Sequence, residues 1–390
     1  MSLKDQVAVV GIGLTYAAPD EAVAVGDLAI LAAEAALDDA GLDRRDIQNL
    51  AWATGAGDPG GMAAAMGVPE VSFSANLTSG ASGAGSLMLA ATSINAGFGD
   101  VCLSVISFQP IPAGGARTSS AYRANFVAGP GAYGGAMAAA PEDAFTTPAG
   151  ISSQGATQAL IANRYLHEHK VPREHLGEVV VNQRANAGDS LTMAEYLSAP
   201  LIVGPLSAYD CTPDFEGGFS AAVITTTAAR ARDLKQPVVL IGGAVTGGTP
   251  SHATPFQMPA ASFGSSGHRD LAAPLYEMAD VGAQDVDVAL IDDDFSPMVL
   301  MQLEDYGFCD FGEAGDYVAR GNTRLEGGKV PVNPHGGNLS RAYVKGLNHV
   351  FEAVEQLRGT ARNQVAGADV ALVTGSPASI PLSAVILRKA

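Results

Sequence analysis

The sequence predicts an α/β fold built from two similar halves. Apolar strand-like runs end in glycine turns and precede amphipathic helices, as at residues 7–13 and 26–40. The unit recurs, because residues 236–243 repeat the opening strand and its Gly turn, and residues 279–289 repeat residues 40–50 in register. With 390 residues, 47% of them hydrophobic, the chain is long enough for two such units. Internal duplication is the favoured interpretation, and chance similarity of two turns is the alternative.

Composition narrows the classes of function. The net charge is −18 and the pI is near 4.6, so the surface repels nucleic acids and anionic membranes. Cys102, Cys211 and Cys309 show neither CxxC spacing nor a disulfide framework. No apolar run reaches the length of a membrane span, and residues 6–13 are too short and strand-like for a signal peptide. We expect a cytoplasmic protein with no nucleic-acid partner and no membrane span.

In the N-terminal half, strands and helices are expected to alternate. Gly26 and Asp27 cap the first helix. The next expected elements are a polar turn at 43–46, strands at 49–54, 71–76 and 100–107, and a helix at 84–96. Gly11 and Gly13 match only the start of a dinucleotide-binding fingerprint, because the third Gly and the immediate helix are missing. A dinucleotide site is therefore not expected.

A long Gly- and Pro-rich excursion follows at about residues 108–208, with helices expected at 154–169 and 176–187. Residues 110–148 have few charges and many Ala and Gly. Such a stretch suits an apolar ligand, a partner surface or a dimer contact. A helix is then expected at 219–234.

Two domains are expected, residues 1–235 and residues 236–390. Near their boundary, Cys211 has apolar neighbours at a strand end, which is more typical of a core cysteine than of a nucleophile. The second domain should end in strands at 370–374 and 384–387.

A polar, glycine-lined loop at residues 332–338 is the stretch best suited to chemistry. Asn333 and Pro334 form a turn signal, and Gly336 and Gly337 allow backbone amides to approach a ligand. An amphipathic helix is expected at 339–358. An ordinary loop before an ordinary helix is the alternative.

Three consecutive carboxylates, Asp292, Asp293 and Asp294, follow a strand. They are not expected to bind a metal, because neighbouring strand side chains point to opposite faces and no His lies at ligand spacing. Asp292 can accept a proton or orient a hydroxyl if it faces the site. Capping of the following helix is the alternative role.

The loop 333–337 and its continuation resemble an active-site motif of the thiolase superfamily, Asn-Pro-x-Gly-Gly followed by Gly-His-Pro-x-Gly. Residues 342–346 occupy the second part, so Tyr343 stands where the family has its catalytic His. Gly80 stands where the family has its nucleophilic Cys, and Val373 stands at its second active-site Cys. Each reacting group of the family is thus replaced.

Other segments extend the resemblance over nearly the whole chain. Residues 292–295 match the family's Asn-Glu-Ala-Phe or His-Asp-Cys-Phe motif. Residues 303–313 are similar to a string common in the lipid-transfer (sterol carrier) branch. The resemblance implies two duplicated halves in a layered αβαβα thiolase fold, with a loop domain over the acyl part of a coenzyme A thioester. The implied substrate-binding residues are Gly80, Ser82, Asn333, Gly336, Gly337 and Gly375.

The replacement of both family cysteines argues against an acyl-enzyme, because in this family the acyl group is bound covalently to a Cys thiolate. Retro-aldol cleavage of a β-hydroxyacyl-CoA needs only a base, a donor to the enolate and an acid. We assign Asp292 as the base and Tyr343 as the acid, with His335 as an alternative proton carrier. The Tyr-type motif resembles thiolase-fold aldolases of steroid side-chain degradation, although those enzymes carry another Tyr where Asp292 stands.

Two other functions remain open: an acyltransferase of the lipid-transfer thiolase type, and a non-catalytic subunit that binds acyl-CoA or a partner. No tightly bound cofactor is expected. The resemblance further implies a small OB-fold and zinc-ribbon partner, for which residues 110–148 are the expected contact. A homodimer is expected as well.

Overall fold

The computed structural model describes most of the 390-residue chain. The described residues are 3–21, 23–53, 59–77, 82–111, 147–149, 151, 154–213, 217–249, 264–341, 344–375 and 381–390. Gly80, Tyr343 and nearly all of the predicted contact stretch 110–148 lie outside them.

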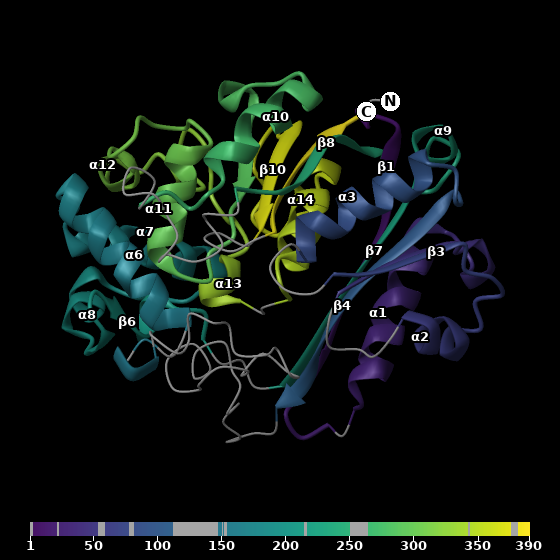
Figure 1. Ribbon diagram of the computed structural model, residues 1–390, viewed down its shortest axis with the longest axis horizontal. Coiled ribbons are helices and arrows are strands. Elements are labelled where there is room, and N and C mark those ends of the chain that lie inside the picture. Colours follow the sequence, from purple (N-terminus) through teal and green to yellow (C-terminus); the bar gives the residue numbers. More distant parts are fainter. Residues whose placement is uncertain are drawn as a thin grey trace.

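Among the described residues, a nine-stranded mixed sheet forms the centre of the molecule (Figure 1). Its strand order is β3-β2-β4-β7-β1-β8-β11-β10-β9. The strands are β1 (Val7–Ala17), β2 (Asn49–Ala53), β3 (Phe73–Leu77), β4 (Val101–Ile111), β7 (Gly217–Thr227), β8 (Val239–Gly247), β9 (Val288–Leu290), β10 (Val370–Gly375) and β11 (Leu382–Lys389). A separate hairpin joins β5 (Leu201–Val203) to β6 (Leu206–Ser207).

The two ends of this sheet repeat one pairing pattern. β1 pairs antiparallel with β7, β7 pairs antiparallel with β4, and β4 pairs parallel with β2. In the same way β8 pairs antiparallel with β11, β11 pairs antiparallel with β10, and β10 pairs parallel with β9. The halves are joined where Ala8 and Val9 of β1 pair with Leu240 and Val239 of β8. This repeat supports our proposed domain boundary near residue 235.

The repeat extends to local hydrogen bonds. Helix α1 (Val25–Ala40) ends at Gly41 with a φ of 69°, and α10 (Arg269–Ala279) ends at Asp280 with a φ of 56°. A one-turn helix follows each, η1 (Arg44–Asp46) and η6 (Ala283–Asp285). In each turn the last Asp accepts a hydrogen bond from the backbone three residues earlier, at 2.8 Å from Asp43 and 2.7 Å from Gly282. The expected match of residues 40–50 with residues 279–289 is therefore visible in the structure.

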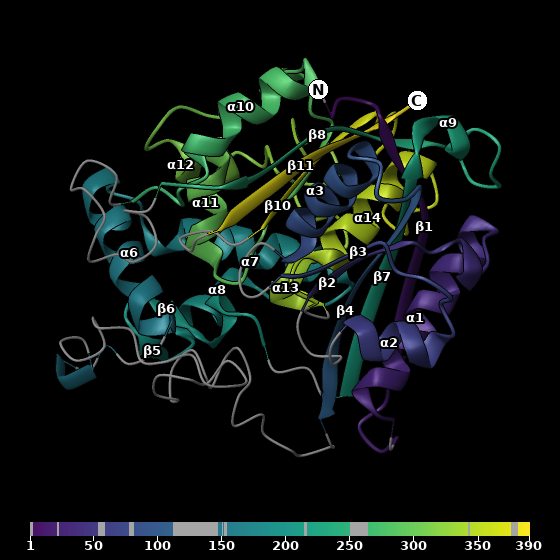
Figure 2. The same cartoon turned by 45° about the vertical axis from the view of Figure 1, so that its right-hand side comes forward.

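Helices cover the sheet in layers, with α3 (Ser82–Asn95) and α14 (Leu347–Arg358) packed together at the centre (Figure 2). Side-chain alternation along the strands explains why. Val7 and Val9 of β1 face this central pair, whereas Ala8 and Val10 face α1. In the other half Val373 faces α14, and Leu372 faces the layer that holds α10 and α11 (Ser296–Asp305). Strands buried on both faces suit this αβαβα arrangement.

The remaining helices complete the outer layers and a lobe beside β9. They are α2 (Pro59–Met66), α6 (Gln154–His169), α7 (Arg173–Ala187), α8 (Met193–Ser198), α9 (Ala228–Ala231), α12 (Ala314–Ala319) and α13 (Gly337–Ser340), with short turns η2 (Thr147–Ala149) and η3 (Ala208–Asp210). The helices expected at 154–169 and 176–187 are α6 and α7, and α7 contacts α11, α12 and α13.

The helix expected at 219–234 is wrong. Residues 217–227 form β7, which lies between β4 and β1, and only Ala228–Ala231 is helical. The β-branched run Val223-Ile224-Thr225-Thr226-Thr227 favours a strand. Because both faces of β7 are buried, its sequence lacks the polar alternation that marks a half-exposed strand.

The continuous helix expected at 339–358 is also wrong. Helix α13 ends at Ser340, and α14 begins only at Leu347. Between them, Lys345 has a φ of 46° and Gly346 a φ of 79°, and this left-handed backbone cannot continue a right-handed helix. The break places Lys345 and Gly346 directly before the start of α14.

We predict that Gly11→Ala destabilises the fold. A Cβ at Gly11 would lie 2.1 Å from the Ala36 carbonyl oxygen of α1, so α1 would have to move from β1, at a cost of about 1–3 kcal/mol. Gly26→Ala is the control, because nothing lies within 4 Å of its Cβ and Ala favours a helix by about 1 kcal/mol. Denaturant unfolding should show a lower free energy of unfolding for Gly11→Ala than for the wild type, and no decrease for Gly26→Ala. Equal stability of the two variants would contradict the described packing.

Candidate active site

The starts of the two central helices touch each other. A Cβ on Gly83, in the first turn of α3, would lie 2.4 Å from the carbonyl carbon of Gly346, the N-cap of α14. A Cβ on Gly346 would lie 3.9 Å from the carbonyl oxygen of Thr374 at the end of β10. Residues adjoining Gly80 and Tyr343 are therefore in contact. The approach of Tyr343 itself to Gly80 stays a prediction.

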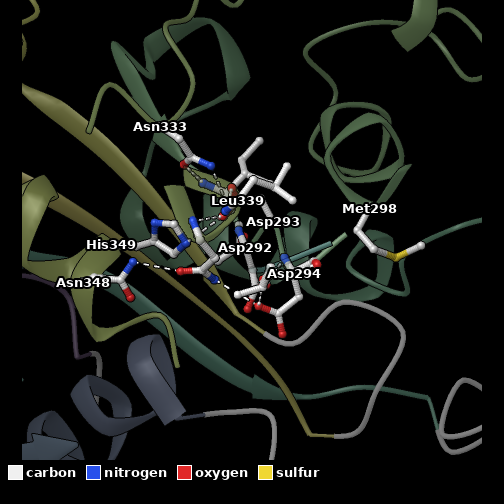
Figure 3. A network of polar contacts seen from close by, with 12 residues as sticks. Asp292, Asp293, Asp294, Met298, Asn333, Leu339, Asn348 and His349 are labelled. Carbon is white, nitrogen blue, oxygen red and sulfur yellow. Dashed lines mark hydrogen bonds and ion pairs between the residues drawn. The ribbon is translucent and has the colours of Figure 1, made fainter. Parts of the chain in front are cut away.

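Asp293 is a fully buried carboxylate that joins three segments of this site (Figure 3). Its Oδ1 accepts a hydrogen bond from the Asn338 backbone N–H at 2.8 Å, and its Oδ2 accepts one from the Leu339 N–H at 3.1 Å. The Nε2 atom of His349 on α14 lies 3.3 Å from Oδ1. A buried charge requires such partners, and here they fix the end of β9 to α13 and α14.

Asp292 lies beside Asp293 with its main chain held on two sides. Its N–H donates to Thr374 Oγ1 at 2.9 Å, and its carbonyl oxygen accepts from Gln302 Nε2 at 2.7 Å. Thr374 Oγ1 in turn donates to Gln302 Oε1 at 2.6 Å. The Asp292 side chain is 5% exposed, and its Oδ1 accepts from the Asp294 N–H at 3.3 Å. The predicted base thus sits at a rigid junction of β10 and α11.

Asp294 completes the carboxylate run at the edge of the site. Burial, and then the negative charges of Asp292 and Asp293, raise the pKa of Asp294 well above its usual value. Its Oδ1 accepts from Asn338 Nδ2 at 3.2 Å and from Thr212 Oγ1 at 3.3 Å. The sequence showed Asp294 within the run of three carboxylates but assigned it no role, and its contacts with Asn338 and Thr212 are visible only in the structure.

Lys345 lies close enough to Asp294 for the two charges to interact. Burial lowers the pKa of Lys345, while the Asp294 carboxylate opposes that shift. This lysine occupies the turn between α13 and α14, where its φ is 46°. Lys345 was not predicted as a site residue, and its position two residues after Tyr343 in the sequence was the available signal.

The 333–337 loop, predicted to approach coenzyme A, is held in place by contacts with the segment that follows β9. Asn333, with a φ of 47°, uses both amide atoms on the backbone of Ile291, accepting from its N–H and donating to its carbonyl, each at 2.8 Å. Gly337 has a φ of 64°, and a Cβ there would lie 2.1 Å from Asp293 Oδ2. Gly336 has a φ of 102° and donates its N–H to the Asn333 carbonyl. The glycines therefore let the loop close around Asp293.

Two histidines meet beside this loop. The rings of His335 and His349 lie edge to face, with centroids 5.1 Å apart. Burial, followed by the charges of His349 and Arg341, lowers the pKa of His335 well below its usual value. A lowered pKa keeps the His335 ring neutral near pH 7 and makes it a weaker base than an exposed histidine. His349 was missed by sequence reasoning because it lies inside an amphipathic helix.

All three cysteines of the chain are described, and none favours a thiolate. Cys102 is fully buried, and burial raises its pKa to about 12. Cys211 is 1% exposed, and burial followed by the charges of Asp210 and Asp294 raises its pKa well above the usual value. Burial raises the pKa of Cys309 to about 12. Because the thiolate is the reactive form, covalent catalysis by cysteine is disfavoured.

Of the other predicted site residues, Gly375 is the buried last residue of β10, and Ser82 opens α3. In the described ranges, no three His, Cys, Asp or Glu side chains gather closely enough to hold a metal ion. None of the described helices is long and apolar enough to cross a membrane.

Known proteins are similar to this chain in sequence and in fold. The family model for the thiolase C-terminal domain-like fold matches residues 247–387. A 17-hydroxy-3-oxo-4-pregnene-20-carboxyl-CoA lyase of Mycobacterium tuberculosis is 33% identical over 99% of this chain and 100% of its own length. A steroid side-chain-cleaving aldolase of Thermomonospora curvata is 32% identical over 99% of this chain and 98% of its own.

Two solved structures are similar to this chain over nearly its full length. The Ltp2-ChsH2(DUF35) aldolase superposes with a TM-score of 0.87 at 28% identity, covering 100% of this chain and 99% of that one. Human mitochondrial 3-ketoacyl-CoA thiolase in complex with CoA superposes with a TM-score of 0.68 at 15% identity, over 100% and 99% of the two chains, which shows the fold alone.

The layered fold and the site at its centre define a thiolase-like protein, and this chain belongs to the thiolase superfamily. Its two full-length relatives named above place it near the steroid side-chain aldolases of that superfamily. The family expectation from the Asn333–Gly337 motif is thereby confirmed.

We predict that Asp294→Asn stabilises the protein at pH 8. A pKa raised in the folded state contributes stability below the ordinary carboxyl pKa and loses it as the pH rises through the raised value, so the ionised group destabilises at pH 8. The melting temperature should rise by about 2–4 °C at pH 8 and change little at pH 4.

Asp43→Asn is the opposite-sign control, because the hydrogen bond from Arg45 lowers the pKa of that exposed carboxyl. The ionised Asp43 carboxylate stabilises the fold at pH values above its ordinary pKa, so the melting temperature of Asp43→Asn should not rise at pH 8. If the difference in melting temperature between Asp294→Asn and the wild type is the same at pH 4 and pH 8, the raised pKa of Asp294 is contradicted.

Proposed function

We propose that this protein cleaves a carbon–carbon bond of a β-hydroxyacyl-CoA by a retro-aldol reaction. The observation that carries the proposal is a thiolase fold in which Cys102 and Cys211 are buried, Cys309 is partly buried, and burial raises the pKa of all three thiols. The lyase and aldolase named above, each similar over nearly the full chain, support the same reaction class. Their names suggest a steroid side chain as the acyl group.

The reaction needs two proton movements and no acyl-enzyme. A base removes the β-hydroxyl proton, the bond between the α and β carbons breaks, and its electron pair forms a thioester enolate. An acid then protonates the α carbon, which gives a carbonyl product and a shortened acyl-CoA. We assign Asp292 as the base and Tyr343 as the acid, with His335 as the alternative proton carrier. Tyr343 suits the acid role because an ordinary tyrosine, with a pKa near about 10, is protonated at neutral pH.

Binding of the thioester is assigned to the elbow before α3 and the loops around Asp293. The substrate's coenzyme A portion is the only nucleotide that the reaction needs. The proposed binding residues are Gly80, Ser82, Asn333, Gly336, Gly337 and Gly375. Of these, Asn333 and Gly337 act by shaping the loop. The side-chain amide of Asn333 is hydrogen-bonded to the backbone of Ile291, and Asp293 Oδ2 fills the space beside Gly337.

We propose that two copies of the chain assemble through β3. This strand is at an edge of the sheet, whereas Val332 forms a bridge with Ala289 along the other edge strand, β9. An open edge strand is a ready site for pairing with a second copy. Phe98 lies beside this edge, 51% exposed, with its ring 5.6 Å from that of Phe73.

A second protein is also proposed as a partner, of the small OB-fold and zinc-ribbon kind that the family resemblance implies. The name of the Ltp2-ChsH2(DUF35) aldolase records a second component in that structure. The free cysteines fit a reducing cytoplasm.

We predict that Tyr343→Phe lowers cleavage of a β-hydroxyacyl-CoA by about 10²–10⁴-fold, because it removes a positioned acid. Release of the ketone or aldehyde, measured with and without a candidate partner protein, reports the reaction. Iodoacetamide should leave the activity unchanged, since all three thiols are buried or poorly ionised.

Tyr317→Phe is the matched control, because Tyr317 is a buried tyrosine of α12 away from the site, and it should keep full activity. Thiolysis of a 3-oxoacyl-CoA that iodoacetamide blocks would favour the acyltransferase alternative. Binding of coenzyme A without turnover of either substrate would favour the non-catalytic alternative.

We predict that the wild-type protein sediments at twice its monomer mass of 39.6 kDa, and that Phe98→Asp shifts it toward the monomer. Leu31→Asp is the control, because Leu31 is 53% exposed on α1 and away from the β3 edge. Analytical ultracentrifugation measures both. An unchanged dimer in the Phe98 variant would place the interface elsewhere.

A further inference from the structure

His349 is a fully buried imidazole for which the proposed mechanism gives no role. It lies in the first turn of α14, three residues after Gly346, the N-cap of that helix. One ring atom, Nε2, is 3.3 Å from the Asp293 carboxylate, and the ring meets that of His335 edge to face. Asp293, His349 and His335 therefore form a continuous row from the end of β9 to the 333–337 loop.

The nitrogens in this row are not satisfied by hydrogen bonds. Both ring nitrogens of His335 and both of His349 are buried and lack a hydrogen-bond partner among the described residues, although Nε2 of His349 is within ion-pair range of Asp293. An unsatisfied buried polar group destabilises the folded protein. Three of these atoms, both ring nitrogens of His335 and Nδ1 of His349, have neither a hydrogen-bond nor an ion-pair partner among the described residues, and such a group calls for an explanation in function.

The charged groups around His349 come from each segment packed against it. Asp293 follows β9, and Glu352 lies one turn further along α14, where the charge of His349 lowers its pKa against the stronger effect of burial. Arg341 follows α13 and opposes positive charge on His335. His335 faces the ring of His349 itself. The charge of His349 disfavours positive charge on His335.

We propose that His349, anchored by Asp293, is a positioning residue that fixes the ring orientation of His335 and keeps that ring neutral for proton transfer. The inference rests on the proposed function only for the identity of the proton that His335 carries. In the retro-aldol reaction this proton is the one that leaves the β-hydroxyl and must reach the α carbon. His349 exchanges no proton with the substrate and acts through His335.

The test combines NMR titration with kinetics on the full-length protein. In His349→Gln the pKa of His335, followed by its ring carbon signals, should rise by roughly one unit, the size of effect that a charge 4–6 Å away produces. The kcat for β-hydroxyacyl-CoA cleavage should fall by about 10- to 100-fold with little change in KM, and the acid limb of its pH profile should move to higher pH.

Gln356→Ala is the matched control, because Gln356 is equally buried on α14 but two turns away, where it contacts Glu352 and Asn363. It should lower the melting temperature without moving the His335 titration. If His349→Gln does not fold, His349→Asn takes its place in the same measurements, since the inference requires the pKa of His335 to depend on the side chain at position 349.

The outcomes separate the inference from the proposed function. A His335 titration that shifts in a protein without lyase activity would uphold the histidine coupling and reject the proposed reaction. An active wild-type enzyme with an unchanged His335 titration and pH profile in His349→Gln would overturn the inference and leave the reaction intact.

Discussion

The buried carboxylate of Asp293 is the constraint on which the site depends. It receives two backbone N–H groups at the start of α13 and faces the imidazole of His349 at the start of α14. Gly337 leaves just enough room for it, since any Cβ there would collide with Oδ2. Three segments that are distant in sequence are thus fixed to one charge, because a buried carboxylate without these donors would be strongly disfavoured.

Two neighbouring contacts extend this frame to the reacting positions. Asn333 holds the loop to Ile291 through two hydrogen bonds, and Thr374 holds the main chain of Asp292. A Cβ on Gly83 would collide with the backbone of Gly346, so the first turn of α3 and the N-cap of α14 lie against each other. Such a frame is independent of the nucleophile, which explains physically how a thiolase fold persists with Gly80 and Val373 where the family has cysteines.

Much of the fold followed from local patterns in the sequence. The repeated turn after α1 and α10 was visible because its aspartates form the same hydrogen bond in both halves. The strand β7 was mistaken for a helix because a strand buried on both faces shows no alternation, and the break at Lys345 was missed although Gly346 stood there as a signal. Propensity is a weak guide where tertiary burial decides.

The site could be predicted only in part. Asp292, Asn333 and His335 were indicated by motif, and the structure brings them to one region around Asp293. The pairing of Asp293 with His349 was not predictable, because 56 positions separate two residues that no local pattern connects. Asn333 was expected to face the substrate, and its amide instead serves Ile291, since a left-handed residue in a buried loop needs its own hydrogen bonds.

The central claim is that this site forms a thioester enolate without a covalent intermediate. Incubation of the protein with a short-chain acyl-CoA in deuterium oxide, followed by mass spectrometry of the thioester, tests it most directly. We predict incorporation of deuterium at the α carbon by the wild type and by a variant with Cys102, Cys211 and Cys309 all replaced by Ala. Exchange that disappears with the cysteines, or that never occurs with either protein, would contradict the account.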